Sequence, residues 1–233
     1  MYISIESNIG GGKSTLLNHI KEHMLPSGWH VAFEDTDLWS NFHNHNLLQK
    51  CYEGDAFYLQ CLVPYTRIEP TVKHKNLLSE RSVMTDSVFI NVHRAHMSNL
   101  EYELNMYMNT KLSYLSRCPQ IMIWIDTPVD VCYDRCKLRA RTEEDVIDKE
   151  FLEEVQKELH KTMMRLSASI PVFIVDGTKS PENICKDIFG EVIKKNGFYH
   201  CPACDLLSFH KYNFFKHIYS RKHLMNHLIR KKS

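Results

Sequence analysis

Short apolar runs alternate with longer segments of helical periodicity along most of this chain. Residues 2–7 form an apolar run, a glycine-rich stretch follows, and residues 14–24 then place apolar side chains at helical spacing. Other apolar runs of strand length lie at 30–34, 120–126 and 171–176. Helical patterns lie at 57–75, 87–116, 128–139, 148–166 and 181–195. Pro64 is expected to kink or shorten the first of these helices. The alternation predicts an α/β fold with a parallel sheet covered by helices.

Composition supports one α/β domain of ordinary size with a small appendage. The 233 residues are 43% hydrophobic and 24% charged, and no apolar run has the length needed to cross a bilayer. Residues 1–4 enter a strand rather than a charged and apolar leader. The eight cysteines lack the dense spacing of a secreted disulfide scaffold. We therefore expect a soluble protein without a membrane partner in a reducing compartment, the cytoplasm. The nucleus, and a virus-encoded protein in a host cell, are the alternatives.

Charge divides the chain into two parts. The formal net charge is +1, yet residues 200–233 hold seven Lys or Arg side chains against the single Asp205. The remainder has 22 basic against 27 acidic side chains. The change follows Asn196 and Gly197, which form a turn signal. We therefore predict two domains, at 1–196 and 197–233.

A glycine-rich segment follows the first predicted strand and opens the first helix. It matches G-x-x-x-x-G-K-[ST] in Gly12, Lys13 and Ser14, while Ser7 replaces the first glycine. Backbone N–H groups of such a loop bind phosphate oxygens, the lysine adds a positive charge, and the hydroxyl reaches Mg²⁺. The predicted ATP-binding residues here are Ser7, Asn8, Ile9, Gly10, Gly11, Gly12, Lys13, Ser14 and Thr15. The loop alone does not distinguish a GTPase, an ATPase and a kinase.

Further motifs follow at spacings that narrow this choice. Glu34 ends the second predicted strand, and Trp39 follows five residues later. Other segments read LLQKCY (47–52), FYLQ (57–60), ERSVMTD (80–86) and DRCKLRARTEE (134–144). Together these motifs resemble the family of deoxycytidine, deoxyguanosine and insect-type deoxynucleoside kinases over residues 1–195. Asp35 stands where that family usually has proline. The resemblance implies a P-loop NTPase-type sheet of five parallel strands and a homodimer.

The resemblance also implies roles at the phosphate end of the site. Glu34 becomes the general base for the 5′-hydroxyl, which fits a strand-end carboxylate within reach of a hydroxyl. Arg81 is implied to orient Glu34 and the transferred phosphoryl group, with Lys13 as a further catalytic residue. Glu80 is implied to hold the water shell of Mg²⁺, together with Ser14.

Contacts to the nucleoside are implied in the same way. Trp39 and Tyr52 become substrate-binding residues, with Tyr52 donating to the sugar 3′-hydroxyl. Gln60 would pair with the Watson–Crick edge of the base. With Arg67 and Asp86 it forms a trio found in relatives that accept deoxycytidine and purine deoxynucleosides. An ionised Asp accepts hydrogen bonds from an amine, and a base without that amine would cost about 1–3 kcal/mol. The alternative is a salt bridge between helices with no ligand.

The DRCKLRARTEE segment resembles the lid of the family. Arg135 and Arg139 lie one helical turn apart, and with Arg141 they are implied to close over the phosphates. Guanidinium groups stabilise charge on the transferred phosphoryl oxygens. Glu144 is implied to bind the 3′-hydroxyl. Lys179 follows the last predicted strand, where the family encloses the adenine of ATP.

The second predicted domain contains a zinc-ligand pattern. Cys201 and Cys204 precede His217 and His223 at the spacing C-x2-C-x12-H-x5-H. Zn²⁺ would supply the folding energy that so small a segment lacks in its own core. The segment resembles the matrin-type finger, for which RNA, DNA or a protein are the alternative partners. His227 is the alternative fourth ligand.

These patterns predict an ATP-dependent kinase that phosphorylates the 5′-hydroxyl of deoxynucleosides, with deoxycytidine or purine deoxynucleosides favoured. One alternative is a thymidine or thymidylate-type kinase, although Glu34 would repel an existing 5′-phosphate. Another is a nucleic-acid-binding zinc-finger protein whose kinase fold no longer turns over. The sequence leaves open the preferred deoxynucleoside, the oligomeric state, the ligand of the finger, the source organism and the effect of Ser7.

Overall fold

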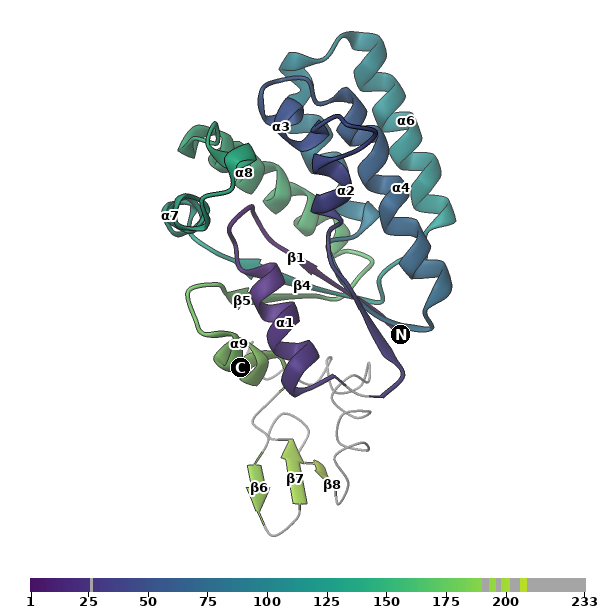
Figure 1. Ribbon diagram of the computed structural model, residues 1–233. Helices are drawn as coiled ribbons and strands as arrows, with labels where there is room; N and C mark the ends of the chain where they lie inside the picture. The colour runs from purple at the N-terminus through teal and green to yellow at the C-terminus, as the bar shows by residue number, and fades with distance from the viewer. Residues whose placement is uncertain (26, 190–192, 196–197, 202–205, 209–233) are drawn as a thin grey trace.

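Five parallel strands form the central sheet, in the order β2-β3-β1-β4-β5 (Figure 1). The computed structural model describes residues 1–25, 27–189, 193–195, 198–201 and 206–208. The strands are β1 (Tyr2–Glu6), β2 (Trp29–Ala32), β3 (Asn76–Glu80), β4 (Ile121–Asp126) and β5 (Val172–Asp176). β1 lies in the middle, with Ile3 opposite Leu78 of β3 on one side and Ile121 of β4 on the other. The predicted α/β fold and its five-stranded parallel sheet are confirmed.

Both faces of the sheet are buried because β4 divides its apolar side chains between two helical layers. Ile121, Ile123 and Ile125 pack with α1 (Lys13–His23) and α9 (Pro181–Phe189) in one cluster. Met122 and Trp124 pack with α5 (Ser87–Val92) and α8 (Lys149–Leu166) in another. Figure 1 shows α1 and α9 together on one side of the sheet and α8 on the other. Burial on both faces explains why this strand reads as a continuous apolar run.

The other helices connect these layers and surround the carboxyl ends of the strands. They are α2 (Thr36–Ser40), α3 (Leu47–Tyr52), α4 (Phe57–Lys73), α6 (Asn99–Leu115) and α7 (Val129–Arg139). The helices predicted over 128–139 and 148–166 are confirmed. The short α2 and α3 were not predicted, because five or six residues are too few to show a period. Asp35 and Asn46 start them as N-cap acceptors.

The helix predicted over 87–116 is interrupted in the structure. α5 ends at Val92, a 3₁₀ turn covers His93–His96, and α6 begins at Asn99. A capping box fixes this second start. The Ser98 hydroxyl accepts from the Glu101 N–H at 3.3 Å, and the Glu101 carboxylate accepts from the Ser98 N–H at 2.8 Å. These bonds satisfy two backbone donors at a new helix start, so one long helix is the wrong prediction.

The expectation that Pro64 shortens its helix is also wrong. α4 runs without interruption from Phe57 to Lys73 and contains both Pro64 and Pro70. Proline removes one backbone donor but does not end a helix that tertiary contacts hold on both sides of it. Here Leu59 and Val63, before Pro64, are buried in the cluster that α4 forms with α2 and α3, and Thr71, after it, is buried as well.

A smaller antiparallel sheet follows the five-stranded sheet in the chain, with the order β6-β7-β8. Its strands are β6 (Ile193–Lys195), β7 (Phe198–Cys201) and β8 (Leu206–Ser208). The helix predicted over 181–195 is therefore wrong at Ile193–Lys195, which form β6, while α9 covers Pro181–Phe189 and residues 190–192 lie outside the described residues. β6 pairs with β7, with Lys195 opposite Phe198. The division of the chain after residue 196 stays a prediction.

The zinc prediction concerns residues that the structure describes only in part. The backbone of Cys201 belongs to β7, and Cys204, His217 and His223 lie outside the described residues. Within the described ranges, no three His, Cys, Asp or Glu side chains gather as a metal site. In those same ranges no helix has the length and apolar character of a membrane span.

Candidate active site

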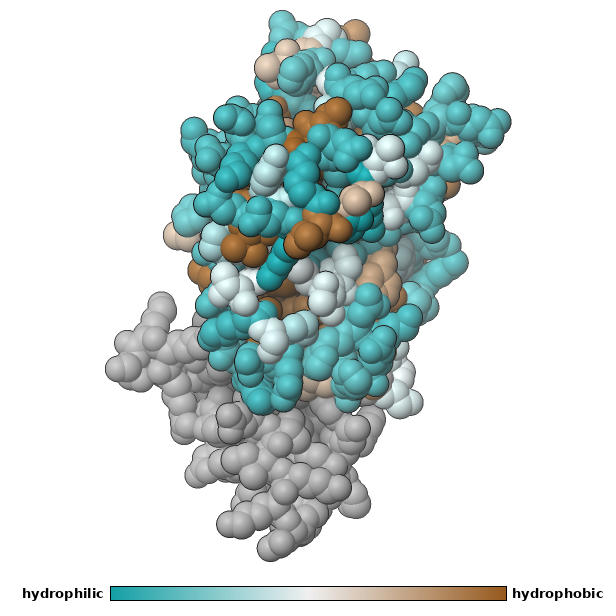
Figure 2. All heavy atoms as spheres, turned by 60° about the vertical axis from the view of Figure 1, so that its left-hand side comes forward, coloured by the Kyte–Doolittle hydropathy of each residue, from teal (hydrophilic) through white to brown (hydrophobic). Residues whose placement is uncertain are grey.

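A cavity of about 660 Å³ lies at the carboxyl ends of β1, β2 and β3, a volume typical of small-molecule sites. Figure 2 shows apolar side chains gathered among polar ones around the middle of the face that α7 and α8 border. Most of the predicted site residues line the cavity. They are Ile9, Gly10, Gly11, Gly12, Lys13, Ser14, Thr15, Glu34, Trp39, Tyr52, Gln60, Arg67, Glu80, Arg81, Arg135, Arg139, Arg141, Glu144 and Lys179. The predicted Ser7, Asn8 and Asp86 do not line it.

The glycine-rich loop depends on each of its three glycines. Gly10 and Gly12 have φ angles of 72° and 99°, in the left-handed region that disfavours side chains. Gly11 has no space for a side chain, because a Cβ there would lie 1.8 Å from Ser7 Oγ. The Lys13 ammonium donates to the Asn8 carbonyl at 3.1 Å, back across the loop. This geometry leaves a backbone cradle at the N-terminus of α1, where phosphate oxygens bind.

Ser7 and Asn8 support this loop from behind. Ser7 Oγ donates to the Ile125 carbonyl in β4 at 2.8 Å. Its own backbone is not left-handed, so serine causes no strain where the motif usually has glycine. The Asn8 amide donates to the Leu152 carbonyl of α8 at 2.8 Å and accepts from the Ile9 N–H with its oxygen. Both side chains therefore attach the loop to neighbouring elements.

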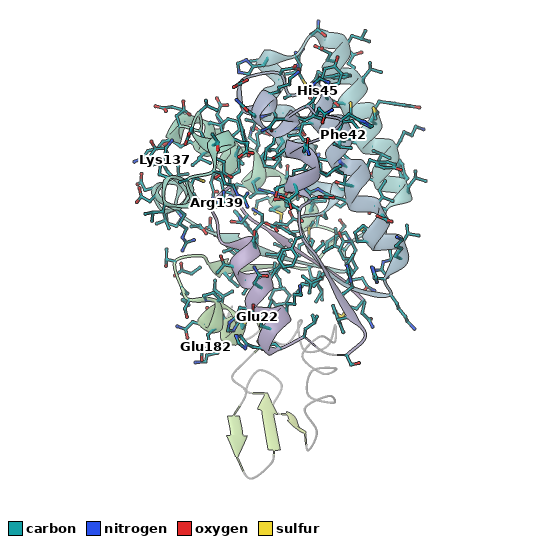
Figure 3. The ribbon with its side chains drawn as sticks, in the orientation of Figure 1. Glu22, Phe42, His45, Lys137, Arg139 and Glu182 are labelled. Carbon is teal, nitrogen blue, oxygen red and sulfur yellow. The ribbon has the colours of Figure 1, made fainter. Side chains whose placement is uncertain are left out.

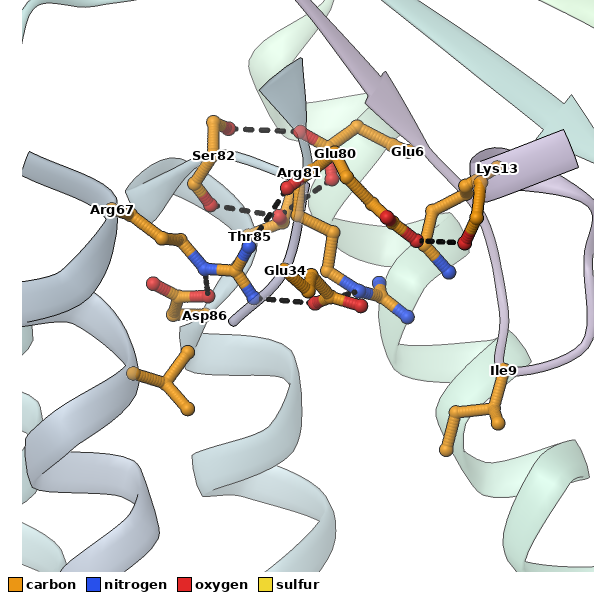
Figure 4. Close-up of polar contacts among 12 residues, drawn as sticks. Glu6, Ile9, Lys13, Glu34, Arg67, Glu80, Arg81, Ser82, Thr85 and Asp86 are labelled. Carbon is orange, nitrogen blue, oxygen red and sulfur yellow. Dashed lines mark hydrogen bonds and ion pairs between the residues drawn. The ribbon is translucent and has the colours of Figure 1, made fainter. Parts of the chain in front are cut away.

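Glu34 lies two residues beyond the end of β2 and between two arginines (Figure 4). Arg67 Nη2 donates to Glu34 Oε1 at 2.7 Å, and Arg81 Nε lies 3.2 Å from the same oxygen. Arg81 has a left-handed φ of 61°, which is unusual for a residue with a side chain. Its Nη1 is buried and has no hydrogen-bond partner among the described residues. A ligand oxygen in the cavity is the kind of group that would satisfy this donor.

The charges around Glu34 keep it ionised. Burial alone would raise its pKa, but Arg67, Arg81 and Lys13 lower the pKa to about 2. For Lys13 the surroundings disfavour the charged form. Burial and the nearby Arg81 lower its pKa to about 8, although Glu34 and Glu80 act to raise it. An ionised carboxylate and a mostly protonated ammonium group therefore face the cavity together at neutral pH.

Asp86 does not itself line the cavity but pairs with Arg67, which does. Its Oδ1 lies 2.9 Å from Arg67 Nε, but without the alignment of a hydrogen bond. Neither carboxylate oxygen accepts a hydrogen bond from the described residues. Burial raises the pKa of Asp86 to about 6, although Arg67 opposes this. The predicted pair is thus present, and Arg67 joins it to Glu34.

Ser14 and Glu80 form the pair predicted to hold Mg²⁺. The Ser14 hydroxyl donates to Glu80 Oε1 at 2.7 Å, at the first turn of α1. A hydroxyl and one carboxylate beside the phosphate cradle are oxygen ligands, which Mg²⁺ prefers together with waters and substrate phosphates. The residues present therefore fit that ion.

The nucleoside end of the cavity is apolar with a few polar groups. Trp39, Tyr52 and Gln60 line it, among Leu48, Leu59, Val63 and Phe89. The Gln60 amide donates to the sulfur of Cys51 at 3.8 Å. Burial raises the pKa of Tyr52 well above its usual value, so its hydroxyl keeps its proton. This is the mix of surfaces that binds a heterocyclic base and a sugar.

The predicted lid arginines are held by contacts within the chain. Arg139 makes two hydrogen bonds to Glu144 through Nη2, at 2.5 and 2.6 Å, and Arg141 lies 3.6 Å from the same carboxylate. In Figure 3, Arg139 lies on the side of α7 that faces α1. Arg135 Nη2 donates to the Gly177 carbonyl at 3.0 Å, while its buried Nη1 has no partner among the described residues. Glu144 is thus occupied by arginines.

Lys179 also lines the cavity but is engaged elsewhere. Its ammonium group donates to Asp187 of α9 at 2.7 Å. Gly177 and Pro181 of the same segment after β5 also line the cavity, beside this ion pair. The role predicted for Lys179, around the adenine of ATP, stays a prediction.

Two residues that hold the site together were missed from the sequence. Glu6, fully buried at the end of β1, accepts from Ser82 Oγ at 2.9 Å and from Thr85 Oγ1 at 2.7 Å. It thereby fixes the segment that carries Arg81 and Asp86. Thr127 Oγ1 donates to the Gly11 carbonyl at 2.9 Å, joining the loop after β4 to the phosphate cradle. A charged residue inside an apolar strand is the signal that could have found Glu6.

Comparison with protein families gives one match to most of the chain. The profile of the family described as deoxynucleoside kinase matches residues 3–196. A fowlpox virus protein described as a probable deoxycytidine kinase is 31% identical over 162 residues, which cover 64% of this chain and 66% of the relative. Human deoxycytidine kinase is 29% identical over 69% of this chain and 76% of its own length. Human mitochondrial thymidine kinase 2 is 24% identical over 86% of this chain and 80% of its own.

Solved structures share the same fold. A deoxyadenosine kinase from M. mycoides with bound dCTP superposes with a TM-score of 0.68 at 21% identity. The superposition covers 80% of this chain and 95% of that protein. At this identity the likeness concerns the fold, which is the five-stranded sheet with its helices.

Proposed function

The chain belongs to the deoxynucleoside kinase family of phosphotransferases, and on that premise we propose that it transfers the γ-phosphoryl group of ATP to the 5′-hydroxyl of a deoxynucleoside. The observation that carries this proposal is the position of Glu34. An ionised carboxylate lies between Arg67 and Arg81, in the same cavity as the phosphate cradle and Lys13. A proton acceptor and phosphate-binding groups in one cavity are what transfer to a hydroxyl requires.

In the reaction, a bond forms between the 5′-oxygen and the γ-phosphorus while the bond from that phosphorus to the β-bridging oxygen breaks. Glu34 accepts the hydroxyl proton. In a loose transition state that proton leaves late, so the position of the carboxylate matters more than its strength as a base. Arg81 fixes Glu34 and offers its free Nη1 to the transferred group.

Lys13 and the lid arginines add positive charge where it develops on the phosphates. Arg135 has a buried donor without a partner, which suits a phosphate oxygen. Arg139 would exchange its bond to Glu144 for one to a phosphate when ATP binds. Ser14 and Glu80 would hold Mg²⁺, which supplies charge neutralisation on the phosphate oxygens.

The proposed substrates are deoxycytidine and purine deoxynucleosides. Asp86 supports this, because its oxygens have no hydrogen-bond donor from the described residues and it lies beside Arg67, which lines the cavity. An exocyclic amine that enters beside Arg67 would supply the missing donor. Gln60 lines the cavity and would read the base edge. The direct test is a kcat/KM series over the four deoxynucleosides with ATP and Mg²⁺. If none of the four deoxynucleosides is phosphorylated, the proposed function is wrong.

A thymidylate-type kinase is less consistent with the site. Such an enzyme binds an acceptor that already carries a 5′-phosphate, and the ionised Glu34 would repel it. Thymidine itself remains a candidate substrate to be measured, since thymidine kinase 2 is among the relatives. Adding thymidylate to the same series separates the two alternatives.

We also propose that the protein is a homodimer that pairs through α4 and α6. These helices lie side by side (Figure 1), and their exposed faces carry large apolar side chains at spacings of three, four or seven residues. The residues are Tyr58, Tyr65 and Val72 on α4 and Leu100, Leu104, Tyr107 and Tyr114 on α6. The same face on a second copy would cover them in a twofold interface.

Sedimentation of a charged variant tests the dimer. Tyr65→Arg should convert it to a monomer, because Tyr65 lies in the middle of this face. Leu138→Arg is the matched control, since Leu138 is an even more exposed apolar residue and lies on α7, away from this face. A monomeric parent protein, or a Tyr65→Arg dimer, would contradict the proposed interface.

For the end of the chain we propose a zinc finger that binds RNA, DNA or a protein. Its support is the ligand spacing of Cys201, Cys204, His217 and His223. The antiparallel pairing of β7 with β8, where Cys201 stands opposite Leu206, agrees with the hairpin that begins fingers of this kind.

A further inference from the structure

Behind the base end of the cavity, three buried polar side chains from different elements form a line. Gln60 of α4 donates from Nε2 to Cys51 Sγ of α3 at 3.8 Å. Cys51 Sγ in turn lies 3.4 Å from Nε2 of His93, at the start of the 3₁₀ turn. Gln60 and Cys51 line the cavity, and His93 lies behind them. Each of the three is at most 4% exposed, so water does not substitute for these contacts.

The number of protons on these groups decides which atom donates and which accepts in each contact. The sulfur accepts a hydrogen bond from Gln60, so its single proton is available to the imidazole of His93. Burial raises the pKa of the Cys51 thiol to about 12, and burial together with His96 lowers the pKa of His93 to about 4. The thiol is therefore protonated and the imidazole neutral at pH 7. We assign His93 the neutral tautomer protonated on Nδ1, so that Nε2, the nitrogen nearest Cys51 Sγ, accepts from the thiol.

We propose that Cys51 and His93 are positioning residues that fix the orientation of the Gln60 amide and thereby decide which base edges the kinase accepts. This inference rests on the proposed function, in which Gln60 reads the base. With its Nε2 held by Cys51, the amide presents its oxygen in one fixed direction. A flipped amide would aim its oxygen at the sulfur and lose the hydrogen bond, because the thiol proton is directed at His93 Nε2.

Orientation matters because the bases divide into two classes at this edge. Cytosine and adenine offer an amine beside a ring nitrogen that accepts. Thymine and guanine offer a carbonyl beside a ring N–H. An amide can pair with either class, but only after turning its oxygen and nitrogen around. A fixed amide therefore adds to discrimination between the classes, by about three- to tenfold for one neutral hydrogen bond.

The test compares kcat/KM for deoxycytidine and thymidine in the full-length protein. In Cys51→Ala the ratio between the better and the poorer substrate should shrink about three- to tenfold, because the amide turns freely. In Cys51→Ser the ratio should be kept, because a hydroxyl also accepts from Gln60 and donates to His93. His93→Phe should shrink the ratio as well, because the thiol proton is then free to bind the Gln60 oxygen.

Controls separate this effect from general damage. Cys61 is a half-buried cysteine on the same helix as Gln60, and its thiol donates to Asn105 away from the cavity. Cys61→Ala should leave the ratio unchanged. Loss of discrimination in Cys51→Ser equal to that in Cys51→Ala would overturn the proposal, as would an unchanged ratio in Cys51→Ala.

Gln60→Ala distinguishes the failure of this inference from failure of the function beneath it. If Gln60→Ala changes the ratio and Cys51→Ala does not, Gln60 reads the base and the positioning role is wrong. If Gln60→Ala leaves the ratio unchanged, the base-reading assignment itself is wrong. A parent protein that phosphorylates no nucleoside contradicts the proposed function.

Discussion

Arg67 donates a hydrogen bond of 2.7 Å from Nη2 to Oε1 of Glu34. The same guanidinium lies 2.9 Å from Asp86 through Nε and donates to the Glu80 carbonyl at 2.9 Å through Nη1. One side chain thus links the carboxylate proposed to accept the proton with the carboxylate proposed to recognise the base. A change at Arg67 is therefore expected to affect both turnover and specificity, whereas a change at Asp86 should affect mainly specificity.

Substitutions at Arg67 and Asp86 should separate these effects. Asp86→Ala should raise the kcat/KM of thymidine relative to deoxycytidine by about tenfold, because the amine loses its acceptor. Arg67→Met with Asp86→Ala should keep this change in preference but lower kcat for every nucleoside, because Glu34 loses a partner. Steady-state kinetics with both nucleosides measures the two effects. An unchanged preference in both variants would remove Asp86 from base recognition.

Glu34→Gln should lower kcat by about 10²–10⁴-fold, the usual contribution of a general base. The amide keeps the shape of the side chain and can still accept from Arg67, so nucleoside binding should persist. Calorimetric titration with deoxynucleoside and a thermal melt supply the controls for binding and folding. Near-normal turnover in a folded variant would exclude Glu34 as the base.

The decrease of kcat/KM for deoxycytidine at acidic pH should follow the protonation of Asp86. Burial raises its pKa to about 6, so protonation below that pH removes the acceptor for the base amine. We expect kcat/KM for deoxycytidine to fall as pH decreases through about 6, and Asp86→Asn to lack that decrease. The free energy of unfolding depends on pH in the opposite direction. Because the pKa of Asp86 rises from its usual 3.8 to about 6 on folding, the protonated carboxyl favours the folded state. This contribution is complete below pH 3.8 and is lost as the pH rises through about 6. A wild-type decrease of kcat/KM retained in Asp86→Asn would assign it to another group.

Gly11→Ala should raise the KM for ATP strongly, because the new Cβ would lie 1.8 Å from Ser7 Oγ. Ser7→Gly combined with Gly11→Ala removes this clash and should recover part of the ATP affinity. The Asn8 carbonyl, 3.0 Å from the same Cβ, limits the recovery. Ser7→Gly alone loses only the bond to Ile125 and should cost about 1 kcal/mol of stability with little change in KM. If the double variant recovers no ATP affinity, the contact with Ser7 Oγ is not the cause of the loss in Gly11→Ala.

Truncation after Asn196 should leave phosphorylation largely intact, because the described residues that line the cavity all lie between Ile9 and Ile184. The full-length protein should contain one zinc ion per chain, and the truncated protein none. Cys204→Ser should lose the zinc while keeping kinase activity. Metal analysis and the same kinetic assay measure both properties. Complete loss of activity on truncation would make the finger part of the catalytic unit.

The sequence by itself determined the features that depend on neighbouring residues. Alternating apolar runs and helical periods predicted the parallel sheet, since strand and helix periods are local properties. The Gly12-Lys13-Ser14 motif predicted the phosphate cradle for the same reason, because its backbone angles are set within one loop. The Ser98 and Glu101 capping box was equally local, but it was overlooked within a long helical pattern.

Tertiary packing decided the contacts between side chains that lie far apart in the chain. Glu34 and Arg67 come from the loop after β2 and from α4, so their bond depends on how α4 packs rather than on either motif. Ser7 Oγ finds the Ile125 carbonyl only because β4 lies beside β1, and this contact explains why serine is tolerated there. The line from Gln60 to His93 likewise requires three elements to meet. The spacing of residues along the chain does not predict these long-range contacts, because they depend on how all the buried side chains pack together.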